Sequence, residues 1–282
     1  MDETHKGRIT KDGIRIHEAA DFAGMHAAGR LAAQILDEVA PMVQPGVTTG
    51  ELDAFITRRV EEEGAVSATI GYRGYQHASC ISVNHVVCHG IPGSKIPGRK
   101  DDVILPQDIL NIDVTVIVDG WYGDTSRMYV AGTPKKFAER LIQVTHDALM
   151  FGIEQVKPGN TFDDIARAIQ EHAHANRMSV VRDFCGHGLG RVFHAPPNVL
   201  HYVPMRRPSE KAAVLEEGMF FTIEPMINLG RPETKVLKDD WTAITLDKKL
   251  TAQFEHSIGV TANGPEIFTL SPGNLFHPTY GE

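Results

Sequence analysis

The sequence predicts an α+β fold made of two related halves, in which antiparallel strands are backed by paired helices. The first observation is a repeat, because the pattern Val-x-Pro-Gly-x-Thr at residues 43–48 recurs at residues 156–161. The second is that helix-like periodicity flanks both Pro-Gly breaks, and the third is that strand-like runs follow both helical pairs. We therefore expect two pseudo-symmetric halves that face each other.

The expected helices have recognisable starts and ends. Residues 18–40 and 135–156 carry apolar residues at helical spacing, and a Pro-Gly pair follows each run. The second helix of each pair is expected to begin near Thr49 and near Thr161. Acidic residues follow both threonines within one turn, where a negative charge favours the positive end of the helix dipole.

The clearest strand signal is a β-hairpin. Residues 109–118 are mostly β-branched and apolar, Asp119-Gly120 is a strong two-residue turn, and residues 121–130 read as the returning strand.

The hairpin register brings two acids together. If Val118 faces Trp121, then Thr115 faces Asp124, and Asp113 lies on the same face because side chains alternate with a period of two. Solvent-exposed edge carboxylates are the alternative. The apolar surroundings of Asp113 disfavour it, because an unpaired carboxylate buried there is costly.

Three more candidate ligands lie in other strand-like segments. Glu224 interrupts the apolar stretch 218–227, where a lone acid is rarely tolerated without a cation. Glu255 should point away from Phe254, although a solvated strand residue would fit equally. His187 lies among glycines, and a lone histidine is more often a satisfied polar residue than a ligand. As a set of four carboxylates and one imidazole, the candidates can hold two divalent cations.

Three motifs join these five residues. They are Val-Cys-His-Gly-Ile-Pro around His89, Val-Phe-His around His194, and Gly-Tyr-Arg-Gly-Tyr ahead of Cys80. From about residue 10 to about residue 270 the chain resembles type I methionine aminopeptidases. The resemblance implies the pita-bread fold, a curved antiparallel sheet backed by helices. It also implies removal of the initiator methionine from nascent polypeptides when the second residue is small.

The resemblance implies a role for each ligand. Asp113 would chelate one metal ion, His187 and Glu224 would bind the other, and Asp124 and Glu255 would bridge both. Manganese, iron, cobalt or zinc all suit such a donor set, and affinity order alone does not select among them.

The resemblance also assigns catalytic residues. Glu224 would shuttle a proton, His194 would stabilise the oxyanion, and His89 would contact the scissile amide nitrogen. From the residues alone, His89 and His194 could equally be structural loop histidines.

A pocket for the methionine side chain should combine aromatic rings with small or sulfur-bearing residues, because a thioether is apolar and polarizable. The resemblance places these substrate-binding residues there or beside the scissile bond: Tyr72, Tyr75, Cys80, His89, Phe193, His194 and Trp241. Trp241 could instead anchor a loop. Thr69 stands where bacterial relatives often carry cysteine, and the long loop 94–107 has no evident role.

Two other function classes share these features. A proline-directed aminopeptidase or prolidase uses the same ligand types but usually carries a further N-terminal domain. A non-enzymatic binding module typically loses metal ligands, and all five are present here.

The 282 residues, 42% of them hydrophobic, suffice for one large domain. We expect an N-terminal segment (1–15), a catalytic metallopeptidase domain (16–270) with halves of about 16–131 and 132–270, and a C-terminal tail (271–282).

The composition indicates which classes of binding partner and which cellular compartment to expect. The net charge of −8 disfavours nucleic acid as a partner. The three cysteines form no Cys-x-x-Cys pair, which favours a reducing compartment. The N-terminus resembles no signal peptide, and no run of 18 apolar residues occurs. We therefore expect a cytoplasmic protein without membrane contact. The resemblance implies that it acts as a monomer that meets nascent chains, in transient association with the ribosome.

Overall fold

The computed structural model describes residues 7–207, 209–276 and 278. Its four α-helices form two sequential pairs, α1 (Asp21–Val39) with α2 (Thr49–Glu62), and α3 (Lys136–Glu154) with α4 (Phe162–Ala175). Short 3₁₀ turns cover Ala40–Met42 and Tyr72–Gly74. The expected helix starts and ends are confirmed to within a few residues.

Capping boxes explain why α2 and α4 begin where they do. The Thr48 side chain accepts from the Glu51 backbone and Glu51 accepts from the Thr48 backbone, and Thr161 and Asp164 repeat this arrangement. Each box satisfies backbone N–H groups that the first helical turn leaves unpaired. The repeat seen in the sequence therefore marks two equivalent helix starts.

Fifteen strands are assigned within the described residues. The first half supplies β1 (Val66–Ser67), β2 (Ser79–Val83), β3 (Val86–Cys88), β4 (Ile109–Val118) and β5 (Trp121–Val130). The second half supplies β6 (Ser179–Val180), β7 (Gly186–Gly188), β8 (Ala195–Val199), β9 (Phe220–Ile223), β10 (Met226–Asn228), β11 (Thr234–Val236), β12 (Ala243–Thr245), β13 (Thr251–Gln253), β14 (His256–Thr261) and β15 (Gly264–Ile267).

All strand pairs are antiparallel, and the predicted hairpin is confirmed in both its limits and its register. Val118 pairs with Trp121 and Thr115 pairs with Asp124. In the first half, β4 also pairs with β1 and β2. The second half has a five-stranded sheet in the order β15-β14-β9-β7-β8, and smaller sheets join β13-β10-β6 and β11-β12-β3.

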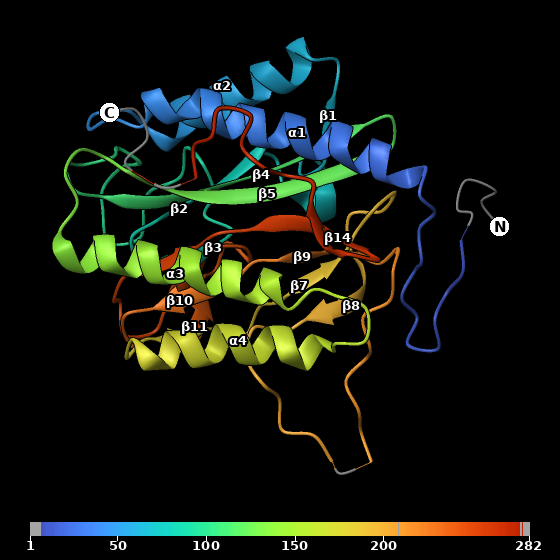
Figure 1. Cartoon of the computed structure of the whole chain (residues 1–282). Coiled ribbons are helices and arrows are strands. Elements are labelled where there is room, and N and C mark those ends of the chain that lie inside the picture. The colour runs from blue at the N-terminus through green and yellow to red at the C-terminus, as the bar shows by residue number, and fades with distance from the viewer. Residues whose placement is uncertain (1–6, 208, 277, 279–282) are drawn as a thin grey trace.

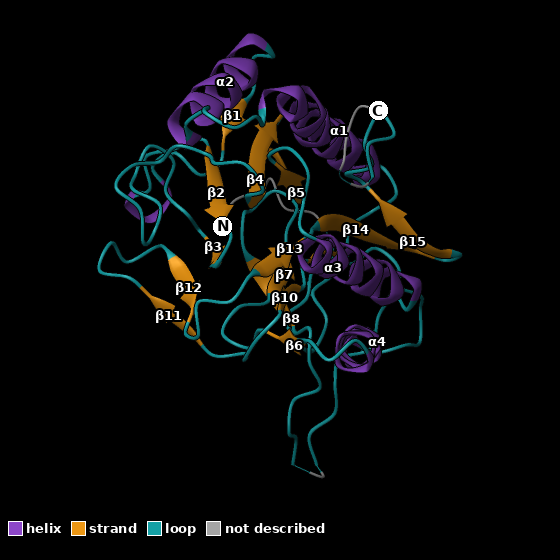
Figure 2. Cartoon of the chain, turned by 90° about the vertical axis from the view of Figure 1, so that its left-hand side faces the viewer, coloured by secondary structure: helices purple, strands orange, loops and turns teal. Residues whose placement is uncertain are grey.

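The helices cover the outside of this strand layer. In Figure 1, α1 and α2 lie above β2, β4 and β5, while α3 and α4 lie against the strands of the second half. The turned view in Figure 2 shows the strands as an inner layer between the two helix pairs. An isolated bridge between Ser126 and Glu255 connects the two halves at the level of the candidate ligands.

Each helix pair buries one apolar cluster. Ile35 and Leu52 pack with Ile112 in the first half, and Ile165 packs with Phe254 in the second. Leu52 and Ile165, which the repeat aligns, are both fully buried. Full burial of such a side chain stabilises the fold by about 1.5–3 kcal/mol. The predicted α+β architecture of two backed halves is thereby confirmed.

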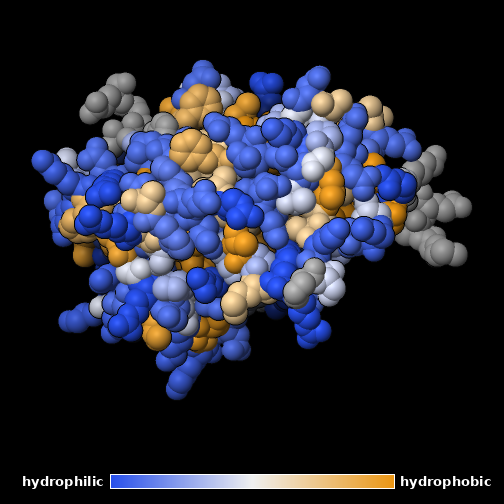
Figure 3. All heavy atoms as spheres, turned by 60° about the horizontal axis from the view of Figure 1, so that its bottom comes forward, coloured by the Kyte–Doolittle hydropathy of each residue, from blue (hydrophilic) through white to orange (hydrophobic). Residues whose placement is uncertain are grey.

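The outer surface is mixed in character. On the face shown in Figure 3, hydrophobic residues are interspersed among hydrophilic ones. No described helix has the length and apolar character needed to cross a membrane.

Candidate metal centre

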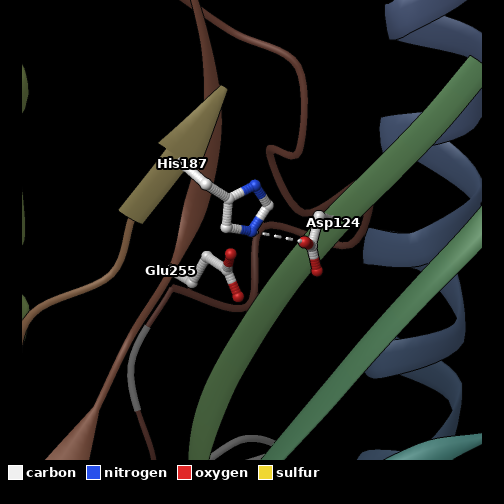
Figure 4. A group of neighbouring side chains, drawn as sticks. All are labelled: Asp124, His187 and Glu255. Carbon is white, nitrogen blue, oxygen red and sulfur yellow. Dashed lines mark ion pairs between the residues drawn. The ribbon is translucent and has the colours of Figure 1, made fainter. Parts of the chain in front are cut away.

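Asp124, His187 and Glu255 form the centre of a buried cluster. One ligand atom from each lies within 4.8 Å of the others. Figure 4 shows His187 directed from β7 toward Asp124 on β5, with the Glu255 carboxylate beside both. Three segments far apart in the sequence thus deliver donors to one point.

Asp124 is held by polar neighbours on both sides of its strand. Thr115 donates a hydrogen bond to Asp124 Oδ1 at 2.7 Å, across the predicted pair. The Ser257 hydroxyl donates to the Asp124 backbone carbonyl at 2.7 Å. Because Asp124 is only 3% exposed, these contacts fix its second oxygen toward the cluster.

His187 presents Nε2 to the carboxylates. Its Nδ1 lies 3.1 Å from the Gly188 carbonyl, which can only accept, so Nδ1 carries a hydrogen and Nε2 is the nitrogen left to pair with the carboxylates when protonated, or to bind a cation when deprotonated. Nε2 lies 3.4 Å from Asp124 and 3.8 Å from Glu224. Burial acts to lower the pKa of His187, but its bond to Asp124 and the charge of Glu224 outweigh burial and raise it.

The glycines around His187 are required by close backbone approach. A Cβ on Gly186 would collide with the Thr222 carbonyl, and one on Gly188 would collide with the Pro196 carbonyl. The glycine-rich sequence therefore allows β7 to lie tightly between its neighbours and bring His187 to the cluster.

Glu224 lies in the break between β9 and β10, not within a central strand as the apolar stretch suggested. Thr222 donates to its Oε1 at 2.8 Å and Gln253 donates to its Oε2 at 3.3 Å. Its backbone N–H donates to His201 Nε2 at 3.1 Å. Burial, followed by the opposing charge of His187 and the like charge of Asp124, places the pKa of Glu224 at about 7.

Asp113 and Glu255 complete the set of carboxylates. Burial and neighbouring carboxylates, Asp124 first among them, raise the pKa of both well above the usual range. Asp113 Oδ1 is buried without a hydrogen-bond partner among the described residues. Glu255 is 3% exposed and points away from the core residue Phe254, so the alternative of a solvated strand residue is wrong.

The donor set fits divalent cations. Burial, followed by the like charge of neighbouring carboxylates, raises the pKa values of Asp113, Glu224 and Glu255, so their charged forms are costly in this low-dielectric site. A dication offsets that cost and gives Asp113 Oδ1 the partner it lacks. The metal-binding character of the site follows from this chemistry, while the number and identity of the ions stay predictions.

All predicted site residues line one cavity of about 1020 Å³. The five candidate ligands share it with the predicted substrate residues Tyr72, Tyr75, Cys80, His89, Phe193, His194 and Trp241. Their individual roles remain predictions.

Aromatic side chains build the cavity wall. The His194 ring contacts His187 and Tyr72, with ring centroids 4.1 Å and 5.2 Å apart. Tyr75 contacts Trp241 at 4.9 Å, and the Tyr75 hydroxyl donates to the Ser79 carbonyl at 2.9 Å. Trp241 therefore contacts the cavity wall in addition to occupying a loop.

Both predicted catalytic histidines are neutral near pH 7. Burial, with the nearby charge of His187, lowers the pKa of His194 to about 4, and burial lowers the pKa of His89. His89 also has a backbone φ of 55°, a conformation that non-glycine residues rarely adopt and that is common at functional sites. A neutral imidazole can still donate one N–H to a substrate atom.

The sequence did not indicate three residues that contact Glu224, namely Thr222, Gln253 and His201. Thr222 and Gln253, which orient Glu224, each lie two residues before a candidate ligand, so strand alternation alone could have placed them on the same face. His201 gives no local signal, because its contact with the Glu224 backbone arises only in the fold. Burial lowers the pKa of His201 to about 3, consistent with an acceptor Nε2.

The fold gives structural roles to Thr69 and to loop 94–107, for which the sequence indicated none. The Thr69 hydroxyl donates to the His77 carbonyl at 2.6 Å, so it serves the loop backbone beside the cavity. In loop 94–107, Asp102 accepts from the Thr49 hydroxyl at 3.1 Å and the Gly50 backbone at 3.0 Å. This loop thus caps the start of α2.

Known proteins share both the sequence and the fold. The profile of metallopeptidase family M24 matches residues 23–262. A methionine aminopeptidase of Rickettsia prowazekii is 51% identical over 268 residues, covering 95% of this chain and 99% of the relative. A methionine aminopeptidase of Escherichia coli is 49% identical over 260 residues, covering 91% and 94%.

Solved structures agree with these matches. The crystal structure of methionine aminopeptidase from Rickettsia prowazekii superimposes with a TM-score of 0.85 at 51% identity, covering 91% of this chain and 100% of the other. A prolidase from Pyrococcus furiosus gives a TM-score of 0.70 at 20% identity, covering 90% of this chain and 65% of the other, and shares the fold alone.

Proposed function

The chain belongs to metallopeptidase family M24, and from this premise we propose that it is a metal-dependent methionine aminopeptidase that removes the initiator methionine from nascent polypeptides. One observation carries the proposal. The five candidate ligands and a wall of aromatic and sulfur-bearing side chains line the same cavity. A methionine in that cavity therefore has its carbonyl beside the ligands and its thioether against the wall.

We assign two divalent ions, of manganese, iron, cobalt or zinc, to the five ligands. Asp113 would hold one ion, His187 and Glu224 would hold the other, and Asp124 and Glu255 would be shared by both. Such ions would supply Lewis acidity to the peptide carbonyl and make water a stronger nucleophile near neutral pH.

Glu224 is the residue of this chain suited to moving the proton. Thr222 and Gln253 bind its two oxygens, so its orientation is set before substrate arrives. A carboxylate that receives a proton from the attacking water can deliver it to the leaving nitrogen.

The two neutral histidines act on the substrate. His194, which stacks on Tyr72 and contacts the tilted ring of His187, donates its N–H to the oxygen on which negative charge develops. His89, which Phe184 and Trp241 contact with ring centroids 5.6 Å and 6.0 Å away, faces the scissile nitrogen.

The methionine side chain lies against five residues that line the cavity, namely Tyr72, Tyr75, Cys80, Phe193 and Trp241. Cys80 is 6% exposed and burial raises its pKa, so it presents a neutral thiol. A polarizable, neutral wall suits a thioether and disfavours a charged side chain.

Peptide cleavage by the metal-loaded protein tests this function. Peptides beginning Met-Gly, Met-Ala or Met-Ser should be cleaved much faster than those beginning Met-Asp or Met-Lys. A bulky second residue displaces the carbonyl, and a misplacement of about 1 Å can cost about 10²-fold in rate. Similar rates across the five peptides, or preferential cleavage of an Ala-Pro peptide, would overturn the proposal.

We also propose a cytoplasmic monomer that meets nascent chains during transient ribosome association. Sedimentation of the purified chain tests the monomer. Cofractionation with translating ribosomes tests the association.

A further inference from the structure

Arg73 stands at the mouth of the cavity, outside the residues discussed above. It lies in the 3₁₀ turn Tyr72–Gly74 with a φ of 48°, between two glycines that also have positive φ. Its side chain is among those that line the cavity. A non-glycine residue in this backbone conformation is uncommon, and here it places a cation in the lining of the cavity.

A series of side-chain contacts connects Arg73 to the candidate metal centre. The His187 ring contacts the His194 ring, and the His194 ring stacks on Tyr72 with an angle of 21° between planes. The Arg73 guanidinium lies 5.4 Å from the centroid of the Tyr72 ring. Arg73 is thus the outermost member of a series that starts at a candidate ligand.

The proposed placement of the substrate sets the direction of a bound peptide relative to that series. With the first residue in the methionine pocket and its carbonyl beside His194, as proposed above, the residues after the scissile bond would lie on the side of Tyr72 and Arg73. In an extended chain the third residue lies about 7 Å beyond the first, at about 3.3 Å per residue. Its side chain then reaches the guanidinium of Arg73.

The charge of Arg73 is available to a ligand. In the described part of the chain, no carboxylate forms an ion pair with it. By contrast, Arg206, which also lines the cavity, is held by Asp163 through two hydrogen bonds of 2.9 Å and 2.8 Å.

We propose that Arg73 is a specificity residue that binds a carboxylate side chain on the third residue of the substrate, and so favours chains that begin Met-small-Glu or Met-small-Asp. This rests on the proposed aminopeptidase activity. The ring of Tyr72 keeps the guanidinium in place, and the planar donor fork can bind both carboxylate oxygens.

The test compares amidated pentapeptides Met-Ala-Glu-Gly-Gly, Met-Ala-Gln-Gly-Gly and Met-Ala-Lys-Gly-Gly, in which no free C-terminal carboxylate is present. At low ionic strength the wild-type kcat/KM should be about three- to fivefold higher for Glu than for Gln, the effect of an exposed ion pair, and lowest for Lys. High salt should reduce the preference, because it screens exposed charges.

In Arg73→Gln, the ratio of kcat/KM for the Glu peptide to kcat/KM for the Gln peptide should fall to about one. In Arg73→Lys, which keeps the positive charge, the ratio should stay above one but below the wild-type value. Arg58→Gln is the matched control, because Arg58 also lies over an aromatic ring, 5.2 Å from the centroid of Phe55, but on α2 away from the cavity. It should keep the wild-type ratio.

Equal ratios in the wild type and Arg73→Gln would overturn the assignment. A further peptide, the unamidated tripeptide Met-Ala-Gln, has a free C-terminal carboxylate. If this carboxylate raised kcat/KM while the Glu side chain of the amidated pentapeptide did not, the assignment would also be overturned. If none of the Met-Ala peptides were cleaved, the proposed function itself would fail, which is a different result.

Discussion

Replacing Glu224 by glutamine in the metal-free protein should change how stability depends on pH. The pKa of Glu224 is about 7 in the fold against a usual 4.5, mainly because the carboxyl is buried. Between these values the folded chain keeps a proton that the unfolded chain releases, so the free energy of unfolding falls as pH rises. Glu224→Gln cannot ionise and should lack this loss.

The size of the effect follows from the same values. At about 1.4 kcal/mol per pKa unit, the gap between 4.5 and about 7 corresponds to about 3.5 kcal/mol, fully expressed well above pH 7 and absent well below pH 4.5. His187 adds to the trend, because Glu224 helps to raise its pKa and that stabilisation is lost as pH rises through the raised value.

The assay is urea unfolding of chelator-treated protein at a series of pH values from about 5 to 8. Wild type should lose about 2.5 kcal/mol more than Glu224→Gln over this range, because part of the loss has already occurred at pH 5, and added manganese at pH 8 should stabilise wild type more than the variant. Exposed Glu217→Gln is the control and should parallel wild type. Parallel curves for wild type and Glu224→Gln would refute the reasoning that the carboxylates repel in a buried site.

Three further variants test other parts of the site. Asp124→Ala should abolish turnover and weaken calorimetric manganese binding, because a bridging carboxylate screens both ions; near-normal turnover would contradict the two-ion assignment. His194→Ala should lower kcat by about 10²-fold or more with little change in KM, and an effect confined to KM would make it a binding residue. Asp53 accepts from the backbone and side chain of Ser79 at 3.0 Å and 2.7 Å. Asp53→Ala should therefore cost about 1–3 kcal/mol in thermal unfolding, whereas an unchanged melting temperature would show that water replaces these bonds.

The sequence alone specified features that depend on local rules. A two-residue turn fixes the register of its hairpin, so the pairing of Thr115 with Asp124 could be read from Asp119-Gly120. Helix starts at Thr49 and Thr161 followed from nearby acids, because capping uses residues within one turn. The candidate ligands were recognisable because acids in apolar strands are rare.

The distances and hydrogen bonds among the site residues were decided by the tertiary structure. The distance from His187 to Asp124 depends on how β7 packs beside β9, and the contact between Ser257 and Asp124 joins segments 133 residues apart. His201 is paired with the Glu224 backbone by the same packing. Local propensity carries no information about such contacts, because they form only when the two halves pack together and exclude water. That exclusion of water also raises the pKa values of Asp113, Glu224 and Glu255 in the metal-free protein.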